Sequence, residues 1–373
     1  MSTDPDVLIL GGGVIGLSCA YFLARAGVRV EVVDKGDFGQ EASWAGAGVL
    51  PPTSVTHSRT PYELLRAHGI AMFPTLSTEL RERTGIDNGY LCCGGLEFVP
   101  AEGDANKEWR GEGTRCEGMD NKALHNLEPA LSPHVKHADF LPEMAQLRNP
   151  RHLKALLAGC ESYHVQMRAG CPVHGFERQG ERITAVRTGM GPLAADRFLI
   201  AAGAWSDGLL EQVGFRPGVH PVRGQIALLN TGAPRIHRIL CQGKRYMVPR
   251  PDGRILVGST EENAGFDKRT TAGAIADLLS FAAVLVPALA GAHLERCWAG
   301  LRPGTLDDLP VLGPVPGITN LFAAAGHFRS GIQLSPSTAL VMKELLLGQP
   351  LTVSLEPFRV DRFAASHGGT AFR

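Results

Sequence analysis

The residues best suited to bind a nucleotide are the glycines of Gly11-Gly12-Gly13-Val14-Ile15-Gly16, which match the pattern GxGxxG. In this pattern Gly11 permits a tight turn, Gly13 lets the backbone approach a pyrophosphate, and Gly16 lets a helix pack closely on a strand. Asp34 follows 18 positions after the last glycine, where its carboxylate would accept hydrogen bonds from ribose hydroxyls. The same charge would repel a 2′-phosphate, so the motif predicts a dinucleotide other than NADP.

The elements around these glycines are those that the motif requires. An apolar strand, Asp6–Leu10, precedes them, and a helical pattern runs from Val14 to Ala26 and stops at Gly27. A second strand, Val28–Val33, ends immediately before Asp34. A free helix N-terminus beside the glycines would present N–H groups to the phosphates. This unit alone fits NAD and FAD equally well.

The loop Gly39–Gly48 favours FAD. It consists largely of small residues, which let the backbone follow an extended cofactor, and the Ser43 hydroxyl can reach a phosphate. A nicotinamide dehydrogenase has no need of such a loop after the ribose-binding strand. No second GxGxxG follows a strand, which argues against a separate NAD domain of the disulfide-reductase kind.

The overall composition narrows the classes of partner. The 373 residues are enough for two domains, and 37 basic side chains balance 37 acidic ones, which argues against nucleic acid and anionic membranes. The eight cysteines form no CxxC pair, so we expect reduced thiols and no metal site. Residues 1–6 do not resemble a signal peptide, and Asp277 and Pro287 interrupt the apolar stretch 272–292. We therefore expect a cytoplasmic protein with no membrane span and a helix pair or a helix-turn at 272–292.

The remaining pattern predicts helices and strands for two domains. Helices are expected over Glu63–Arg83, from an Asn149-Pro150 cap to about Tyr163, and from a Ser335-Pro336 cap to about Gly348. Residues 101–122, rich in glycine and charge, are expected to form a surface excursion on the second domain. Strands are expected at 170–175, 183–187, 198–202, 222–229, 245–250, 254–258 and 321–325, with a hairpin turn at Pro251–Gly253.

These elements predict an α/β fold with a discontinuous, Rossmann-like FAD-binding domain and a second α+β substrate domain built on an antiparallel sheet. We assign residues 1–85, 146–220 and 300–373 to the FAD-binding domain. Residues 86–145 and 221–299 would then form the substrate-binding domain.

Five segments carry a resemblance that covers nearly the whole chain. They are LILGGGVIGLSCAYFLARAG at the start, LIAAGAWS at 199–206, YMVPR at 246–250, ILVGSTEENAGFDKRTT at 255–271, and WAGLRPGTLDDLPVLGP at 298–314 together with AAGHFRSGIQLSPSTA at 324–339. The chain resembles the D-amino-acid oxidase superfamily of FAD enzymes, and within it the glycine oxidase family of the thiamine pathway.

The resemblance implies that Arg302 pairs with the substrate carboxylate, that Tyr246 hydrogen-bonds the same group, and that Arg329 lines the site. A guanidinium grips a carboxylate in a bidentate manner, and a phenol adds a directional donor. The alternatives are an ion-paired structural arginine at 302 and a core tyrosine at 246. Lys244 and Glu261 flank the site without a defined orientation. The two prolines of Val49–Ser54 match no glycine-specific pocket, so the substrate's identity stays open.

We expect FAD to be bound without a covalent bond, because GLRPGT contains no cysteine or histidine. His327 is expected to be a structural turn residue beside the flavin. The N-terminus of the helix near Ser335, or the backbone of 329–332, is expected to face the flavin pyrimidine ring. The expected contacts are Gly11, Gly13, Val14, Ile15, Gly16, Asp34, Lys35, Ser43, Ala47, Gly48, Val173, Ala202, Gly203, Trp205, His327, Arg329, Ser330, Gly331, Ile332 and Gln333.

The resemblance implies oxidation of glycine or a small D- or N-methyl amino acid to its imine, with O₂ reduced to H₂O₂. Hydride transfer needs no dedicated base if the amine binds in its neutral form. The alternatives are a dehydrogenase of the same fold that passes electrons to a quinone or carrier, a flavin-binding module of a larger enzyme, and an NAD-linked dehydrogenase. The oligomeric state, including a homo-oligomer, is left open.

Overall fold

A six-stranded sheet forms the upper half of the molecule in the computed structural model, which describes residues 4–98, 109 and 111–363. The strands lie in the order β19-β20-β13-β1-β2-β9, and all neighbours are parallel except β19 and β20. Their bounds are Val311–Pro314 (β19), Leu321–Ala325 (β20), Arg197–Ile200 (β13), Val7–Leu10 (β1), Val30–Val33 (β2) and Gln166–Arg168 (β9).

Both faces of this sheet are covered, which is why its central strands are apolar throughout. Four helices pack on one face: α1 (Val14–Arg25), α3 (Pro61–Thr84), α6 (Asn149–Ser162) and α9 (Gly331–Leu346). The other face packs against α7 (Ser206–Glu211) and a small antiparallel sheet of β10 (Val173–Gln179), β11 (Arg182–Thr188) and β12 (Gly191–Ala194). Alternate residues of β1 point to opposite faces of the sheet. Ile9 packs in the core with the four helices, and Leu8 packs in the core on the other face.

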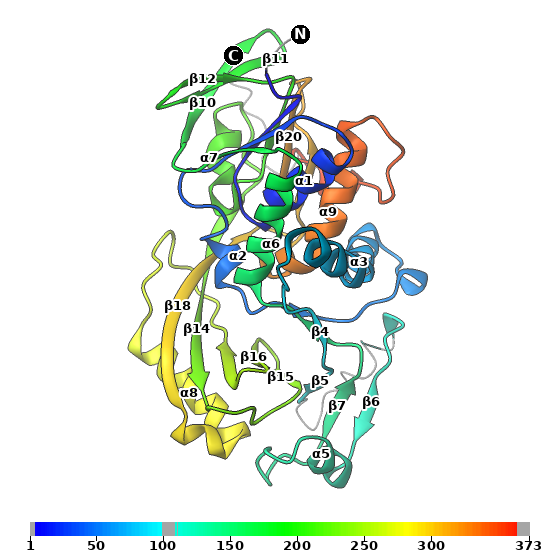
Figure 1. Ribbon diagram of the computed structural model, residues 1–373, viewed down its shortest axis with the longest axis vertical. Coiled ribbons are helices and arrows are strands. Elements are labelled where there is room, and N and C mark those ends of the chain that lie inside the picture. Colours follow the sequence, from blue (N-terminus) through cyan, green and yellow to red (C-terminus); the bar gives the residue numbers. More distant parts are fainter. Residues whose placement is uncertain (1–3, 99–108, 110, 364–373) are drawn as a thin grey trace.

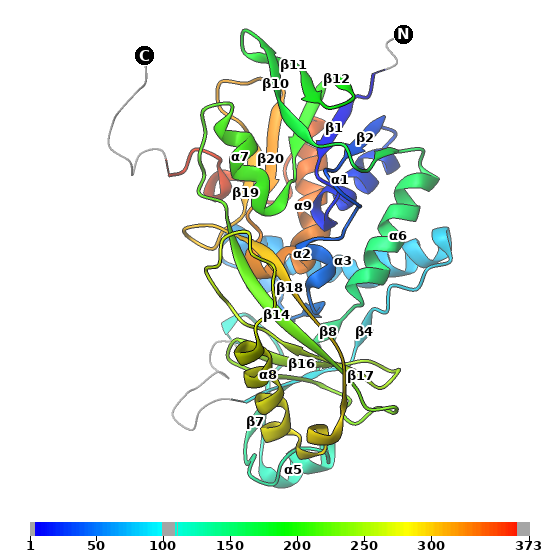
Figure 2. The ribbon, with the colours of Figure 1, turned by 90° about the vertical axis from the view of Figure 1, so that its left-hand side faces the viewer.

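An eight-stranded sheet forms the lower half of the molecule (Figures 1 and 2). All its neighbouring strands are antiparallel except β15 and β5. In spatial order they are β18 (His293–Gly304), β14 (His220–Asn230), β17 (Arg254–Gly258), β16 (Arg245–Pro249), β15 (Ile239–Gln242), β5 (Gly95–Glu97), β7 (Ala138–Leu141) and β6 (Glu117–Met119).

Helices α8 (Ala272–Leu285) and α5 (Asn121–Leu127) pack on one face of this sheet. On β16, Met247 points to that core, while Tyr246 and Val248 belong to the cluster on the opposite face. Between the two large sheets lie α2 (Ala42–Ala45) and a small sheet of β3 (Val49–Leu50), β8 (Ala145–Gln146) and β4 (Leu91–Cys92). The face of the large sheet away from α8 is therefore free to form a site.

The long strands β14 and β18 connect the two halves of the molecule (Figure 2). They pair continuously from His220 opposite Gly304 to Asn230 opposite His293, with one register shift. This pairing carries Arg302 from the antiparallel sheet to the edge of the parallel one. The domain boundaries that we assigned remain a proposal, and β18 crosses the boundary placed at residue 300.

Most predicted elements are confirmed, with ends that shift by one or two residues. The predicted helix at Glu63–Arg83 is α3, which begins with a capping box of Thr60 and Glu63. The predicted strand at 254–258 is β17, and Pro251–Gly253 is the turn before it. The apolar stretch 272–292 forms α8 followed by a short 3₁₀ helix. The surface excursion at 101–122 falls partly outside the described residues.

The predicted start of the last helix at Ser335 is wrong, because α9 begins at Gly331 and contains Pro336 within its second turn. A proline there lacks the N–H that would bond to the carbonyl of Ile332. The Ser335 hydroxyl donates to that carbonyl at 2.9 Å instead. Ser335 thus replaces the missing hydrogen bond and does not cap the helix.

Two smaller predictions also need correction. Asn149 is the first residue of α6 and not its cap, and its side-chain amide donates to the carbonyl of Ser43 at 2.7 Å. The strand expected at 170–175 begins only at Val173, because Gly170 adopts a left-handed turn with φ of 64°. In both cases a residue type that is typical of helix or strand ends has another use: Asn149 bonds to a loop, and Gly170 forms a turn before the strand.

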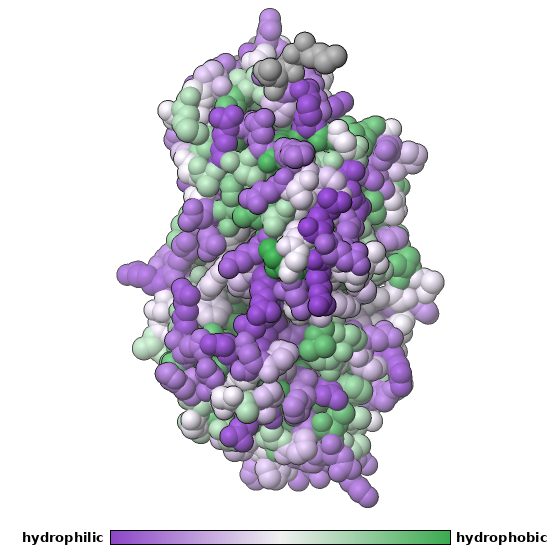
Figure 3. Space-filling model, viewed as in Figure 1, coloured by the Kyte–Doolittle hydropathy of each residue, from purple (hydrophilic) through white to green (hydrophobic). Residues whose placement is uncertain are grey.

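The surface of the molecule is mixed in character. Figure 3 shows hydrophilic and hydrophobic residues interspersed over the visible face. Within residues 4–98, 109 and 111–363, none of the helices combines the length and apolar character that crossing a bilayer requires. In the same part of the chain, no group of three or more His, Cys, Asp or Glu side chains is placed to hold a metal ion.

Buried His152 on α6 predicts a pH dependence of stability. Burial lowers the pKa of its imidazole to about 4, so only the unfolded chain takes up this proton between pH 6.5 and 4. The contribution of His152 to stability is complete above pH 6.5, and about 2 kcal/mol of it is lost at pH 5. The variant His152→Gln keeps an acceptor for Asn88 but has no imidazole to titrate. Between pH 7 and pH 5 we expect its Tm to fall less than the Tm of the wild-type protein. Identical slopes of Tm against pH for both proteins would contradict this.

Candidate cofactor and substrate site

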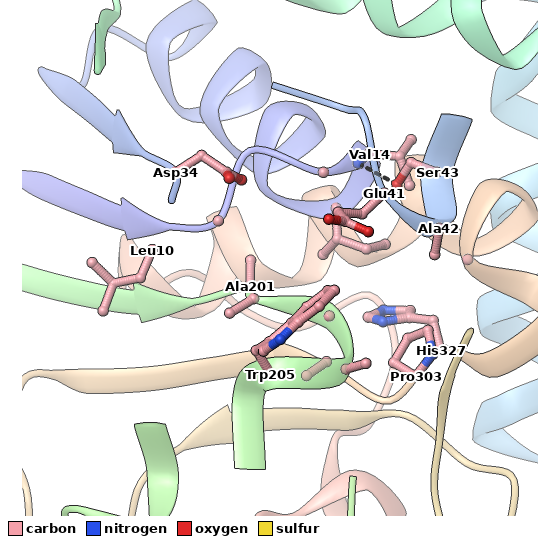
Figure 4. A pocket seen from close by; sticks show the side chains of 18 of the residues that line it. Leu10, Val14, Asp34, Glu41, Ala42, Ser43, Ala201, Trp205, Pro303 and His327 are labelled. Atoms are coloured by element: carbon pink, nitrogen blue, oxygen red, sulfur yellow. Dashed lines mark hydrogen bonds between the residues drawn. The ribbon is translucent and has the colours of Figure 1, made fainter. Parts of the chain in front are cut away.

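A cavity of about 380 Å³ lies along the carboxyl ends of β1, β2 and β13 (Figure 4). Ligands of open α/β sheets bind at this edge. We call this cavity the first pocket. The residues predicted to contact the cofactor that line it are Gly11, Gly13, Val14, Ile15, Asp34, Lys35, Ser43, Val173, Ala202, Gly203, Trp205, His327, Arg329, Gly331 and Ile332.

Each of the three motif glycines is required for a different steric reason. Gly11 has φ of 117°, and a Cβ there would overlap the carbonyl of Ala201 on the neighbouring strand. A Cβ on Gly16 would overlap the carbonyl oxygen of Gly11, so this glycine holds α1 against the turn and does not line the first pocket. A Cβ on Gly13 would meet only Ser43 Oγ, at 3.2 Å. The space beside Gly13 is therefore left for a ligand and not filled by protein.

The N-terminus of α1 is prepared for an anion. Its first turn contains no acidic residue, and the positive end of the helix dipole favours negative charge. Ser43 Oγ accepts a hydrogen bond from the backbone N–H of Val14 at 2.9 Å (Figure 4). This bond fixes the hydroxyl beside the turn and leaves its own hydrogen free to donate to a phosphate.

Asp34 is held at the end of β2 by the backbone. One carboxylate oxygen accepts from the N–H of Gly12 at 2.7 Å, and the other accepts from the N–H of Gly36 at 2.9 Å. An ionised carboxylate has about four acceptor sites, so two remain for ribose hydroxyls. The position of Asp34 on the wall of the first pocket fits this use.

A second pocket of about 410 Å³ lies on the free face of the antiparallel sheet. It adjoins the first, since Ala42, Gly46, Arg302, Arg329 and Ile332 line both. Tyr246 lines only the second pocket, as do four residues that we predicted to contact the cofactor, which are Ala47, Gly48, Ser330 and Gln333. The structure thus places these four on the wall of the second pocket and not of the first.

Arg302 stands where the two pockets meet. Its guanidinium donates to Ser259 Oγ at 2.6 Å and to the carbonyl of Thr260 at 3.1 Å. Both partners are neutral, and no carboxylate of residues 4–98, 109 and 111–363 forms an ion pair with it. Burial lowers the pKa of Arg302, and the nearby Tyr246 hydroxyl opposes this shift through a hydrogen bond and charge. The charge of Glu261 also opposes this shift, but no ion pair in the described part of the chain occupies the guanidinium, which makes it a strong site for a carboxylate.

Two glycines make room for this pair. A Cβ on Gly224 of β14 would overlap the guanidinium of Arg302. A Cβ on Gly258 of β17 would come within 2.7 Å of the Tyr246 ring. Both therefore help to bring Arg302 and Tyr246 to the same side of the sheet. Tyr246 also packs against the hydrophobic cluster on this face, and the roles of Arg302 and Tyr246 toward a substrate stay predictions.

Arg329 lies at the mouth of the second pocket in a small ionic network. It approaches Glu261 at 3.5 Å and donates to the carbonyl of Lys244 at 3.3 Å, while Lys244 and Glu261 pair at 2.6 Å. Burial raises the pKa of Glu261, but Lys244, Arg329 and Arg302 outweigh it, so this pKa lies below its ordinary value. Glu261 therefore stays ionised and is engaged by its neighbours, which leaves Arg302 for the ligand.

His327 has a structural setting within the first pocket. It is buried, and its Nε2 lies 3.1 Å from the Thr338 hydroxyl of α9. Burial lowers its pKa to about 3, so the ring is neutral at physiological pH. The nearby N-terminus of α9 lines the same pocket through Gly331 and Ile332, and its first turn contains no acidic residue.

Several residues of the site were not predicted from the sequence. Ser259, which anchors Arg302, lies within the quoted motif ILVGSTEENAGFDKRTT, so the motif could have indicated it. Arg66, Tyr62 and Trp109 line the second pocket from segments with no local signal for it.

The residues around the first pocket fit FAD. The pocket provides a glycine turn at a helix N-terminus, a carboxylate at the strand end and a second helix N-terminus at the far end, and it opens into a pocket with an unpaired guanidinium. The carboxylate would accept from a ribose, the glycine turn with its helix N-terminus would face a pyrophosphate, and the second helix N-terminus would face an electron-rich ring. The donor set and the open space at Gly13 are the observations on which this fit rests.

Comparison with known proteins gives consistent results. A family model described as FAD dependent oxidoreductase matches residues 6–345. The glycine oxidase of Pseudomonas putida is 37% identical over 358 residues, which cover 95% of this chain and 98% of that protein. A bifunctional ThiO/ThiG protein of Synechocystis is 34% identical and covers 97% of this chain, but only 55% of its own length is matched.

The crystal structure of glycine oxidase from Geobacillus kaustophilus superimposes with a TM-score of 0.91 at 33% identity, covering 97% of this chain and 99% of that one. This chain belongs to the family of FAD-dependent oxidoreductases to which the glycine oxidases also belong.

Proposed function

We propose that this enzyme oxidises glycine, or a small D- or N-methyl amino acid, to its imine, with O₂ as the electron acceptor. The observation that carries this proposal is the unpaired guanidinium of Arg302 beside Tyr246, at the junction of the two pockets. The names of the similar proteins support the substrate class. The amino acid would bind with its carboxylate on Arg302 and Tyr246 and its α-carbon toward the first pocket.

The chemistry balances as a two-electron oxidation. The substrate would lose a hydride from the α-carbon and a proton from the amine, which forms the C=N bond. Water would then hydrolyse the imine to a 2-oxo acid and ammonia, or to a 2-oxo acid and methylamine where the substrate carries an N-methyl group. Bound FAD would supply the acceptor for the two electrons, and O₂ would take them up with two protons to leave as H₂O₂. The protein contributes position and charge: Arg302 and Tyr246 orient the substrate, and the α9 N-terminus offers a positive dipole end to an electron-rich ring.

An anaerobic titration tests the substrate class. We expect the flavin absorbance of the purified holoenzyme to bleach on mixing with glycine, sarcosine or a small D-amino acid, and H₂O₂ to form in stoichiometric amounts when air is admitted. The second pocket has a volume of about 410 Å³, which is enough for ligands larger than glycine. The panel therefore includes bulkier N-substituted glycines. Fast bleaching by a bulky amine without a carboxylate would contradict the role of Arg302.

The electron acceptor is tested by the same experiment. Bleaching by the amino acid followed by slow reoxidation in air, but fast reoxidation by a quinone, would replace the oxidase by a dehydrogenase. A link to the synthesis of the thiazole of thiamine is a further part of the proposal, suggested by the resemblance. A thiamine requirement in cells that lack the gene would support it, and growth without thiamine would argue against it.

A further inference from the structure

The segment 263–270 extends from the antiparallel sheet to the rim of the first pocket. It follows β17 and leads into α8, so by its place in the chain it belongs to the antiparallel half of the molecule. Its tip nevertheless contacts residues that line the cofactor pocket. We call residues 263–270 the clasp loop.

Two side chains of the clasp loop make these contacts. The ring of Phe266 packs against the ring of Trp205, with 5.3 Å between centroids and 32° between planes. The ammonium of Lys268 pairs with Glu41 at 3.0 Å. Trp205 and Glu41 both line the first pocket. Phe266 remains 53% exposed, so the contact with Trp205 does not place it in a core.

The inner side of this pocket wall carries a further charge. The ammonium of Lys35 lies 3.2 Å from the centroid of the Trp205 ring, and Lys35 also lines the pocket. Glu41 raises and Lys268 lowers the pKa of Lys35 through their charges, although burial is the larger cause that lowers it. Lys35, Glu41 and Lys268 therefore form one electrostatic group around Trp205.

The clasp loop is also fixed to β14, both at its two ends and between Phe266 and Lys268. Arg223 pairs with Glu262 at 2.5 Å and with Asp267 at 3.3 Å. The side chain of Gln225 accepts from the N–H of Thr271 at 2.7 Å and donates to Glu262 at 2.8 Å. Because the Arg223–Asp267 pair holds the loop between Phe266 and Lys268, these two side chains can leave Trp205 and Glu41 by their own movement, without displacement of the whole loop.

We propose that the clasp loop is part of the FAD-binding site, where Phe266 and Lys268 hold Trp205 and Glu41 in place as the outer wall of the pocket. FAD then leaves mainly when these two contacts open, so they set the rate of cofactor release. This inference rests on the family's cofactor and not on the proposed substrate, and its readout uses no amino acid. A failure of the proposed substrate class leaves it unaffected.

The rate of FAD release from the holoenzyme tests the proposal. An excess of a foreign apoflavoprotein captures the released FAD, and the change in flavin fluorescence gives the rate. We expect Phe266→Ala to release FAD about five- to tenfold faster than wild type, in line with the loss of one aromatic pair and its apolar contact. The control is Met190→Ala, because Met190 is 64% exposed in the turn between β11 and β12 and lines neither pocket.

Lys268→Ala provides an independent variant. We expect release to be about threefold faster at low ionic strength, with no difference from wild type in 0.5 M salt, because the pair is exposed and screened. Lys268→Arg should restore the wild-type rate. Release at the wild-type rate from both Phe266→Ala and Lys268→Ala would overturn the proposal.

Stability measurements separate a clasp from a purely structural role. The proposal expects the apoprotein of Phe266→Ala to melt at the wild-type Tm. A lower apoprotein Tm with an unchanged rate of release would overturn it, and if this variant does not fold, Lys268→Ala carries the test. A second readout is trypsin cleavage after Lys268 and Arg269, which we expect FAD to slow. Equal cleavage with and without FAD would also count against the clasp.

Discussion

Replacing Arg302 with alanine is expected to raise the KM for the amino acid by at least tenfold while FAD stays bound. The guanidinium is anchored by neutral acceptors, Ser259 Oγ and the Thr260 carbonyl, so its charge is available to the substrate. Hydrogen bonds to a charged group contribute about 1.5–3 kcal/mol, which corresponds to a loss of kcat/KM of about 10- to 150-fold. Steady-state kinetics and the flavin spectrum of the purified variant measure both quantities.

Two further variants sharpen this result. Arg302→Lys keeps the charge but loses the planar fork, so we expect a KM between those of wild type and alanine variant. Arg296→Ala is the matched control, because Arg296 lies on the same strand, packs on Trp44 and lines neither pocket. Unchanged kinetics of Arg302→Ala would remove this residue from the site, and a variant purified without flavin would assign it to the fold.

Alanine substitutions at two motif glycines are expected to weaken FAD binding for different reasons. Gly13→Ala should fold with a wild-type Tm as apoprotein, because its Cβ would meet only Ser43 Oγ at 3.2 Å. It should bind FAD at least tenfold more weakly, because the methyl group occupies the path of the pyrophosphate. Gly16→Ala should lose stability as well, by about 1–3 kcal/mol, because its Cβ would overlap the Gly11 carbonyl.

The control for both variants is Gly273→Ala. Gly273 lies in the first turn of α8, and a Cβ there meets nothing within 4 Å. Since alanine favours a helix over glycine by up to about 1 kcal/mol, this variant should be at least as stable as wild type and bind FAD normally. Flavin titration and thermal melting distinguish the three cases. Tight FAD binding by Gly13→Ala would show that the pyrophosphate does not pass this residue.

The sequence predicted the first βαβ unit correctly because all of its signals are local. The apolar run of β1, the glycines, the helix and Asp34 lie within about thirty residues, a span over which turn chemistry and side-chain periodicity decide the structure. The strand at 254–258 was predicted to the residue for the same reason, since a turn at 251–253 precedes a short apolar run. Long motifs also indicated the family, which the comparisons confirm.

Local signals were less reliable where one residue type serves two purposes. Ser335-Pro336 looks like a helix start, yet in the structure the serine hydroxyl satisfies the carbonyl that the proline leaves without a donor. Asn149 looks like a cap, yet its side chain joins α6 to the loop at Ser43. The partner that distinguishes these uses is in each case fixed by the folded chain.

The sequence by itself determined the family, the cofactor class and the order of the elements, because these follow from short-range patterns and from motifs. Only the tertiary structure decided which side chains meet. Arg302 contacts Ser259 because β14 pairs with both β18 and β17. Phe266 contacts Trp205 because the loop after β17 extends from the antiparallel sheet to the first pocket. Such contacts join residues more than forty positions apart. Their geometry depends on strand order and register across two sheets, which no local preference encodes.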